Sequence, residues 1–301
     1  MRQIKVAIVG WGNVGRFCKQ VLQQTTDMQL VGVVRRAASI KKQDELLSDT
    51  RVVSDIKELG KVDIAIVSVP SRLAPQKVST LLEKGISTVD SFDIHTQILA
   101  TKKCLQKKAV AHKAVSIFGA GWDPGTDSCV RALFQIVCPA QKTTTTFGGV
   151  KGGRSMGHTA AVKAIKGVKN AVSLTLPNGA GKQKREVYIE LMPNADFKQV
   201  EHAIKTDDYF KDDPTTVHAV DDIAKYDTLN HGGELEQKTS QIVQDYVVEG
   251  INPLMTANVL VSSARAAYRA LKRKEYGAYV MIERPLIDYI AGDLSDQMKG
   301  Y

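Results

Sequence analysis

The chain has 301 residues, of which 43% are hydrophobic and 24% are charged, and its formal net charge is +9. This length accommodates two compact domains, and the composition is ordinary for a globular protein, which argues against disorder and fibrous architectures. The apolar runs are too short for a membrane span, and no charged-then-apolar leader precedes the first predicted strand, so we expect neither a membrane protein nor an exported one. The basic residues are scattered over predicted helical faces, which favours anionic small molecules over nucleic acid as partners.

The cysteines and histidines predict neither disulfides nor a metal site. The four cysteines lack CxxC spacing and suggest reduced thiols in the cytoplasm; they are Cys18, Cys104, Cys129 and Cys138. The six histidines are dispersed, and none pairs with Cys or Glu at ligand spacing. A hydrolase-type nucleophile is also unsupported, because no Gly-x-Ser-x-Gly elbow occurs.

The first predicted strand, residues 5–9, runs into the glycine-rich segment Gly10-Trp-Gly12-Asn-Val-Gly15. Gly10 permits a sharp strand-to-helix turn, Gly12 lets the backbone approach a pyrophosphate, and Gly15 lets the next helix pack closely on the sheet. Backbone N–H groups at the helix start, around Asn13 and Val14, are then expected to hold the phosphates. The alternative is a chance glycine turn in another α/β protein.

The second predicted strand, residues 30–34, ends in Arg35 and Arg36, where NAD-binding chains usually carry an acidic residue for the ribose 2′-hydroxyl. A pair of guanidinium groups suits a 2′-phosphate instead. The sequence therefore favours NADP over NAD, although arginines at a strand end are often only solvated surface.

Residues 1–121 alternate between β-branched runs and helical patterns, which predicts a Rossmann-like, doubly wound parallel sheet. Further strands are expected at 51–53, 64–67, 87–89 and 114–118, and helices at 73–84 and 96–108. The carboxyl ends of the strands meet at one rim, where ligands of such sheets bind. This rim is expected to carry the segments 68–71, 90–93 and 119–125, and to contact the cofactor through Ser68, Pro70 and Ser71.

Residues 122–254 predict an α+β domain with a mostly antiparallel sheet. Its strands are expected at 143–147, 171–176, 185–191, 215–220 and 244–248. Residues 255–301 form a third segment, in which a long amphipathic helix over 256–274 is expected to return to the dinucleotide-binding domain.

The segment Gly119 to Gly125 is the densest unusual cluster in the chain. Trp122 could form an apolar wall and Asp123 could bind an ammonium group, although Asp123 could also cap a helix that begins near Pro124. Asp90 stands at a neighbouring strand end. If both carboxylates face one ligand, their repulsion is expected to raise one pKa towards the range useful for proton transfer. Asp93 is more readily explained as the cap of a helix that starts near His95.

The segment from Gly152 to Thr159 precedes a helical run, whose start could accept an anionic group. His158 could donate a proton there, but a histidine in a first turn is more often a scaffold residue. Thr175, Arg185 and His231 lie on separate elements and together could hold a carboxylate.

Taken in order, these clusters resemble the meso-diaminopimelate D-dehydrogenase family along essentially the whole chain. The resemblance rests on five strings, namely the glycine-rich segment 10–15, Thr88-Val-Asp-Ser-Phe-Asp-Ile-His95, Gly121-Trp-Asp-Pro-Gly-Thr-Asp-Ser128, Ser155-Met-Gly-His158 and Asn252-Pro253. It implies reversible oxidative deamination of the D-centre of meso-2,6-diaminopimelate by NADP, giving L-2-amino-6-oxopimelate, ammonia and NADPH. It also implies a homodimer, in which residues 122–254 form the substrate-binding and dimerisation domain.

The resemblance further implies a role for each site residue. Asp90, Trp122 and Asp123 would hold the D-amino centre, with Met156, Gly157 and Phe147 at the same end. At the other end of the substrate, the L-centre and its carboxylate would be read by Thr175, Arg185, His231 and Asn252. One branch of the family carries Gln at Met156 and Asp at Ala160. The chain is therefore similar to the shorter, second type, in which D-amino acid specificity is relaxed and 2-keto acids can be reductively aminated.

Two other functions stay open at this point. One is another reductase of the same two-domain plan, such as a diaminopentanoate dehydrogenase or a dihydrodipicolinate reductase. The other is a redox sensor that binds NADPH without turnover.

Overall fold

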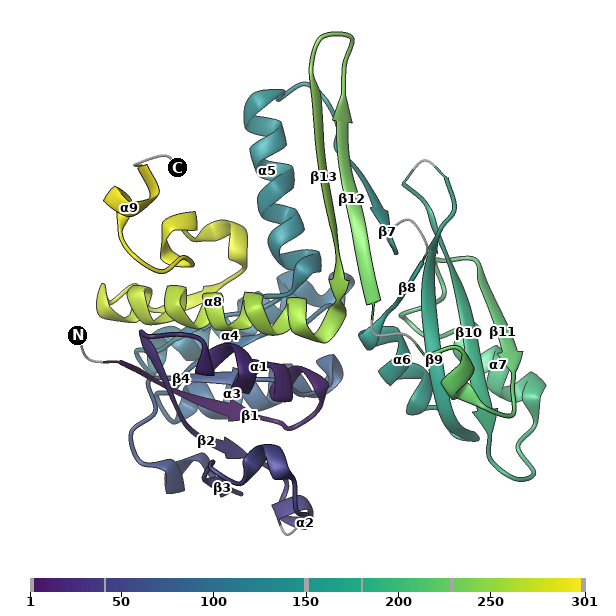
Figure 1. Ribbon diagram of the computed structural model, residues 1–301, viewed down its shortest axis with the longest axis horizontal. Helices are drawn as coiled ribbons and strands as arrows, with labels where there is room; N and C mark the ends of the chain where they lie inside the picture. The colour runs from purple at the N-terminus through teal and green to yellow at the C-terminus, as the bar shows by residue number, and fades with distance from the viewer. Residues whose placement is uncertain (1–2, 41, 149–151, 180, 228–229, 299–301) are drawn as a thin grey trace. The chain divides into compact units, whose positions relative to one another are not determined.

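The computed structural model describes residues 3–40, 42–148, 152–179, 181–227 and 230–298. The chain divides into two compact units (Figure 1). Unit 1 comprises Met1–Cys129 and Leu254–Tyr301, and unit 2 comprises Val130–Pro253. The chain leaves unit 1 within helix α5 (Asp127–Val137) and re-enters it within helix α8 (Asn252–Lys272).

Unit 1 is built on a seven-stranded sheet with the order β14-β6-β5-β4-β1-β2-β3, in which every pairing is parallel. The strands are β1 Ile4–Val9, β2 Met28–Val34, β3 Val52–Val53, β4 Ile64–Val67, β5 Ser87–Asp90, β6 Val115–Ile117 and β14 Gly277–Tyr279. This sheet confirms the predicted Rossmann-like fold. Its strand order reverses between β1 and β4, and that reversal is where such sheets bind nucleotides.

Helices cover the sheet of unit 1 with their apolar sides. Buried side chains of α1 (Asn13–Gln23) and α8 pack with β1, β2 and β4 in one core. Helices α3 (Ala74–Glu83) and α4 (Ile98–Ala111) lie against each other, α3 beside β5 and α4 beside β14. The short helices of this unit are α2 Ala37–Ile40 and α9 Leu294–Met298. The parallel β-branched strands are thereby shielded from water, as their near-continuous apolar sequences require.

Unit 2 contains two smaller sheets. The first has the order β11-β10-β9-β8 and the second has the order β13-β12-β7. The strands are β7 Thr144–Phe147, β8 Gly153–Arg154, β9 Val168–Pro177, β10 Gln183–Leu191, β11 Thr215–Ala219, β12 Asn230–Lys238 and β13 Val243–Ile251. All pairings are antiparallel except that of β10 with β11, which confirms the prediction of a mostly antiparallel sheet domain.

The four-stranded sheet of unit 2 packs against α6 (Met156–Lys163) and α7 (Phe197–Lys205) around buried aliphatic residues and Phe210. The three-stranded sheet is tied to the part of α5 that belongs to unit 2. Arg131 donates to Thr145 on β7, and the Gln244 amide on β13 donates to the backbone oxygen of Phe134. Along the described part of the chain, no helix combines the length and the apolar character needed to cross a bilayer.

Candidate active site

The glycine-rich turn between β1 and α1 has the close contacts that the sequence predicts. Gly10 has φ +107°, and a Cβ on it would lie 2.5 Å from the backbone oxygen of Ser68; a Cβ on Gly15 would lie 2.6 Å from the oxygen of Gly10. Both positions therefore exclude any larger residue. Gly12 is different, because a Cβ there would meet no atom within 4 Å. It is the N-cap of α1 and provides no side chain to cap the first N–H groups, which suits a phosphate.

Ser68 connects this turn to the neighbouring strand β4. Its backbone N–H donates to the oxygen of Val9 at 2.9 Å, and its hydroxyl donates to the oxygen of Gly10 at 3.1 Å. Pro70 is exposed, and Ser71 opens a 3-10 turn that ends at Leu73. Ser68 thus lies directly beside the glycine turn, and all three predicted cofactor residues follow the end of β4 at the carboxyl rim of the sheet.

Arg35 and Arg36 directly follow β2, at the same rim. The backbone N–H of Arg35 bonds to the oxygen of Val53, and its guanidinium donates to the oxygen of Lys42 at 3.0 Å. Arg36 is exposed. The nearby carboxylate of Asp44 accepts from the Trp11 indole N–H and from Arg16, both at 2.8 Å. The residues present fit NADP, because two arginines follow β2 and the nearby Asp44 carboxylate is already paired.

Asp90 ends β5 and is buried, with 1% of its surface exposed. Its carboxylate accepts from the backbone N–H of Phe92 at 2.9 Å and also from that of Gly119. Burial raises the pKa of Asp90 to about 7, against the lowering effect of these two hydrogen bonds. The sequence predicted a raised carboxyl pKa but attributed it to repulsion between Asp90 and Asp123, and that cause is wrong; desolvation is the cause.

Trp122 and Asp123 belong to a kinked helical turn, Trp122–Thr126, that directly precedes α5. The Asp123 carboxylate bonds to Nε2 of His95 at 2.9 Å. This hydrogen bond is the largest of the effects that raise the pKa of His95, and the charges of Asp123, Asp127 and Asp93 add to it. A histidine thus stands among three carboxylates beside a buried tryptophan, an arrangement that the sequence did not predict.

The structure bears differently on the two capping alternatives. The 3-10 turn at His95–Gln97 has Ile94 at its N-cap position, so the prediction that Asp93 occupies that position is wrong. Asp123 has extended φ/ψ angles inside the kinked turn Trp122–Thr126. Extended angles are typical of an N-cap residue, so capping of the helix that begins near Pro124 stays an alternative for Asp123.

In unit 2, the short strand β8 gathers most of the residues predicted to hold the substrate. Gly153 pairs with Thr175 on β9, and a Cβ on Gly153 would lie 2.6 Å from Cα of His231. The Asn252 amide donates to the backbone oxygen of Arg154 at 3.0 Å.

The remaining predicted residues of unit 2 also lie close to this strand. Phe147 ends β7, and a Cβ on the next residue, Gly148, would lie 2.3 Å from the oxygen of Thr175. Met156 and Gly157 open α6, two residues after β8. The structure therefore brings these predicted substrate residues of unit 2 together around β8.

Arg185 and Thr175 are direct partners on adjacent strands. The guanidinium Nη1 donates to Oγ1 of Thr175, and Nε donates to Oδ2 of Asp213 at 2.8 Å. Arg185 and Thr175 are both buried. Asp213 is a residue that the sequence analysis missed, because it precedes Pro214 in an acidic stretch that resembles an ordinary surface turn.

His158 is a scaffold residue. Its Nδ1 bonds to Oγ of Ser155 at 2.7 Å, and Ser155 caps α6. Its ring contacts those of Tyr209 and Phe210 edge-on, with centroids 4.9 and 5.0 Å apart. These contacts favour the structural interpretation of this residue over proton donation.

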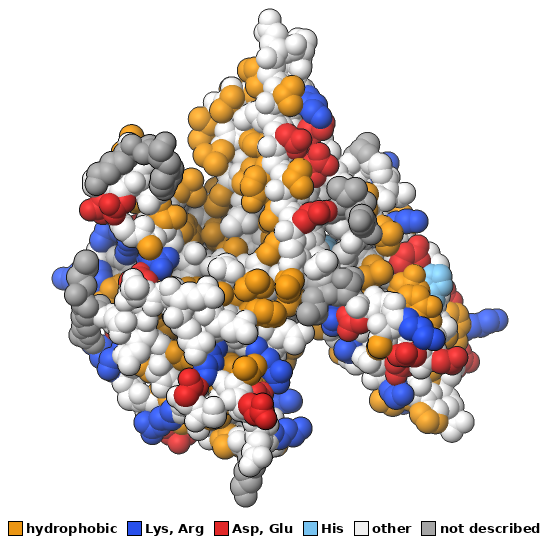
Figure 2. All heavy atoms as spheres, viewed as in Figure 1, with side chains coloured by type: hydrophobic (Ala, Val, Ile, Leu, Met, Phe, Trp, Pro, Cys, Tyr) orange, Lys and Arg blue, Asp and Glu red, His pale blue; other side chains and the backbone are white. Residues whose placement is uncertain are grey.

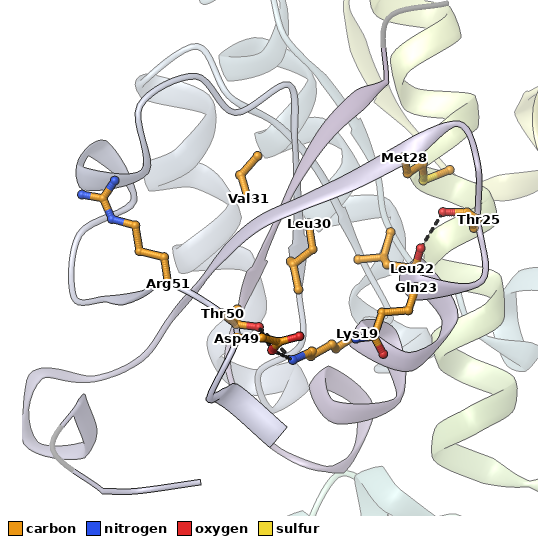
Figure 3. Close-up of a pocket in the computed structure, with 10 residues that line it drawn as sticks. All are labelled: Lys19, Leu22, Gln23, Thr25, Met28, Leu30, Val31, Asp49, Thr50 and Arg51. Carbon is orange, nitrogen blue, oxygen red and sulfur yellow. Dashed lines mark hydrogen bonds and ion pairs between the residues drawn. The ribbon is translucent and has the colours of Figure 1, made fainter. Parts of the chain in front are cut away.

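A surface pocket of about 480 Å³ lies in unit 1 between α1, β2 and the segment that leads into β3. Figure 3 shows that Lys19 points towards Asp49 and Thr50. Its ammonium donates to both of these side chains and to the oxygen of Leu46. All three of its N–H groups are therefore used within the protein, and we do not assign ligand binding to this pocket.

Two protein families and a known relative match this chain. Residues 4–90 match the oxidoreductase family with an NAD-binding Rossmann fold, and residues 121–181 match the diaminopimelic acid dehydrogenase C-terminal domain. The chain is 44% identical to the meso-diaminopimelate D-dehydrogenase of Bacteroides fragilis, over 97% of each chain.

Two solved structures are similar over nearly the whole chain. An engineered D-amino acid dehydrogenase bound to NADP+ aligns with a TM-score of 0.87 and 27% identity, and the alignment covers 98% of each chain. A C. glutamicum DAP dehydrogenase in complex with DAP aligns with a TM-score of 0.86 and 28% identity, over 99% of each chain.

Proposed function

The chain belongs to the meso-diaminopimelate D-dehydrogenase family, and from this premise we propose that it oxidises the D-centre of meso-2,6-diaminopimelate with NADP. The products are L-2-amino-6-oxopimelate, ammonia and NADPH, one water is consumed, and the reaction is reversible. In reverse, 2-keto acids would be reductively aminated to D-amino acids. The observation that carries the proposal is the identity of 44% over 97% of both chains.

The cofactor site is assigned to the rim of the unit 1 sheet. The backbone around Gly10, Gly12 and Gly15, with the N–H groups of Asn13 and Val14, would hold the pyrophosphate. The 2′-phosphate would be bound by Arg35 and Arg36. Ser68, Pro70 and Ser71 would flank the nicotinamide end. When bound, NADP supplies the hydride acceptor.

The amine end of the substrate is assigned to Asp90, Trp122 and Asp123. The substrate ammonium first loses a proton, and loss of hydride from the D-carbon of the resulting amine leaves an iminium cation, which water hydrolyses to the ketone and ammonia. The Asp123 carboxylate would stabilise first the ammonium and then the iminium charge. Asp90 can hold or release a proton near neutral pH, because burial raises its pKa to about 7. Trp122 would exclude water from the opposite side.

The rest of the substrate is assigned to unit 2. Thr175, Arg185, His231 and Asn252 would bind the L-centre and its carboxylate, with Arg185 contributing the positive charge. Phe147, Met156 and Gly157 would contact the chain nearer the D-centre. Half-buried Met156 gives an apolar contact there, which suits D-amino acids without a second polar end.

We also propose a homodimer. Figure 2 shows apolar side chains gathered over α5 and the β12–β13 hairpin. The exposed ones there include Leu133, Ile136, Val137, Val243 and Val247. Exposed apolar patches of this kind commonly mark an interface. All four cysteines are free thiols, as is usual in a reducing compartment, and we place the enzyme in the cytoplasm.

A spectrophotometric assay tests the proposal. NADPH should form from meso-diaminopimelate and NADP, more efficiently than NADH forms with NAD, and the reverse reaction should require ammonia. A diaminopentanoate dehydrogenase or a dihydrodipicolinate reductase would not oxidise NADPH with L-2-amino-6-oxopimelate and ammonia. A redox sensor would bind NADPH without any turnover.

A further inference from the structure

The Arg185 guanidinium is held on two sides within unit 2. Its Nε donates to Oδ2 of Asp213 at 2.8 Å, and its Nη1 donates to the Thr175 hydroxyl. The side chain of Arg185 is 7% exposed and that of Asp213 is 18% exposed, so solvent competes little with this ion pair. An arginine side chain has several rotatable bonds, and two fixed hydrogen bonds on different nitrogens define the plane of its guanidinium.

Asp213 is itself anchored. The Gln183 amide donates to both Asp213 oxygens, at 3.0 and 3.3 Å. The backbone N–H of Asp213 bonds to the oxygen of Phe210, which lies in the core of unit 2, and the N–H of Arg185 bonds to the oxygen of Pro214. Asp213 therefore sits on a short segment that is fastened to β10 on one side and to the core on the other.

This arrangement suits recognition of a carboxylate better than it suits stability alone. Partly buried ion pairs contribute little net stability, because desolvation offsets their attraction. A guanidinium whose plane is already fixed loses less conformational entropy when it binds a carboxylate. The Asp213–Arg185 pair would then increase binding affinity only for substrates that carry the second carboxylate.

We propose that Asp213 is a positioning residue that orients the Arg185 guanidinium for the substrate's distal carboxylate, and that it thereby favours dicarboxylic over monocarboxylic D-amino acids. This inference rests on the proposed function, since it requires that Arg185 bind the L-centre carboxylate. It assigns Asp213 no contact with the reacting atoms.

The test compares D213N with wild type in the NADP-dependent oxidation of meso-diaminopimelate and of D-alanine. Asparagine keeps an oxygen for Nε but removes the charge. KM for meso-diaminopimelate should rise roughly tenfold while kcat stays unchanged, since a hydrogen bond to a charged group is weakened. The constants for D-alanine, which has no second carboxylate, should not change. D213E, which restores the charge, should recover part of the lost affinity.

The matched control is E201Q. Glu201 pairs with Lys205 at 2.6 Å on α7 of the same unit, so this variant also removes one ion-paired carboxylate. Its constants should equal those of wild type. If D213N does not fold, as judged by its melting temperature, Q183L tests the same idea by removing the anchor of Asp213, with a smaller rise in the same KM.

The outcomes separate the inference from its premise. Equal losses with both substrates, a fall in kcat for meso-diaminopimelate, or an unchanged KM in D213N would each show that Asp213 has a structural role only. If D-alanine is not turned over by wild type, the split between KM and kcat with meso-diaminopimelate decides alone. Absence of any wild-type turnover of meso-diaminopimelate would instead refute the proposed function.

Discussion

Two charged side chains of the proposed substrate site, Asp90 in unit 1 and Arg185 in unit 2, are held in place by different kinds of interaction. Asp90 is fixed by burial and by two backbone N–H groups, with no cation among the causes of its pKa shift. Arg185 is fixed by an ion pair with Asp213 and a hydrogen bond to Thr175.

This difference has a chemical consequence. A buried carboxyl without a cation keeps its proton to higher pH and can exchange it near neutrality, whereas an arginine stays charged at any physiological pH. The first group is therefore suited to a centre that changes charge during a reaction. The second suits a carboxylate that stays the same throughout.

The strongest test of this contrast is the pH dependence of stability in D90N. Because the folded pKa of Asp90 is raised to about 7, the folded state binds this proton more tightly than the unfolded state does. The contribution of Asp90 to the free energy of unfolding is fully present below the unfolded aspartate pKa. It is lost as pH rises to about 7, and the total loss is roughly 4 kcal/mol.

Urea unfolding at about pH 4 and about pH 8 should show that loss in wild type relative to D90N. D55N is a control of opposite sign. The pKa of Asp55 is lowered, chiefly by the hydrogen bond from the Lys57 N–H, so its contribution is lost as pH falls instead. A wild-type profile that runs parallel to D90N would contradict the assignment of Asp90.

D123N should cause the largest loss of activity. In the proposed mechanism Asp123 faces the developing cation, so removing its charge is expected to lower kcat/KM for meso-diaminopimelate by about 100- to 1,000-fold, with little effect on NADPH binding. Steady-state kinetics and NADPH fluorescence titration measure the two effects. D293N, an exposed carboxylate near the C-terminus, is the control. Retention of full turnover in D123N would favour a role in sensing over catalysis.

Cofactor preference can be tested without changing any residue assigned to the substrate. The double variant R35D/R36A should raise KM for NADP by about 10- to 100-fold, because charge-assisted hydrogen bonds to the 2′-phosphate are lost, and should shift preference towards NAD. KM for the amino acid should stay the same. K103D/K107A on α4 makes the same change in net charge and serves as the control. An equal rise of KM for NADP in this variant would show that net charge, and not contact with the 2′-phosphate, causes the effect.

H95Q should have the smallest effect. His95 is half-exposed and bonds to Asp123 at 2.9 Å, and a pair this exposed is worth roughly fivefold in activity at most. The carboxylates raise the pKa of His95, so its charged form persists to higher pH than usual. In wild type, kcat/KM should change as pH rises through that raised pKa, and H95Q should lose this limb of the profile. H112Q, on the same unit, should retain it.

Six of the seven strands of the parallel sheet were predictable because each is a short apolar run in an alternating strand-helix pattern, whereas β14, a three-residue strand after α8, was not predicted. Strand β12 was not predicted. Its residues include Gly232, Gly233 and several charged side chains, and only Leu235 and Gln237 face inwards near its end. Strand β12 is held in place by pairing with β13 on one side and β7 on the other. The local sequence of a strand does not indicate such pairing.

At the site, the types of residue were predictable but their partners were not. Carboxylates at strand ends pointed to the rim, and the motif strings pointed to the family. The His95–Asp123 bond joins residues 28 apart, as does the Asp213–Arg185 bond. Both depend on which loops lie side by side. The cause of the Asp90 pKa shift was mistaken for the same reason, because burial is a property of the fold and not of the motif.

Stereochemistry gives the most direct test of the central assignment. The enzyme is incubated with NADP and either meso- or L,L-diaminopimelate, and NADPH and the keto product are measured. NADPH should form with the meso isomer alone, and the remaining amino centre of the product should have the L configuration. Equal turnover of the L,L isomer, or a product that retains the D-centre, would contradict this account.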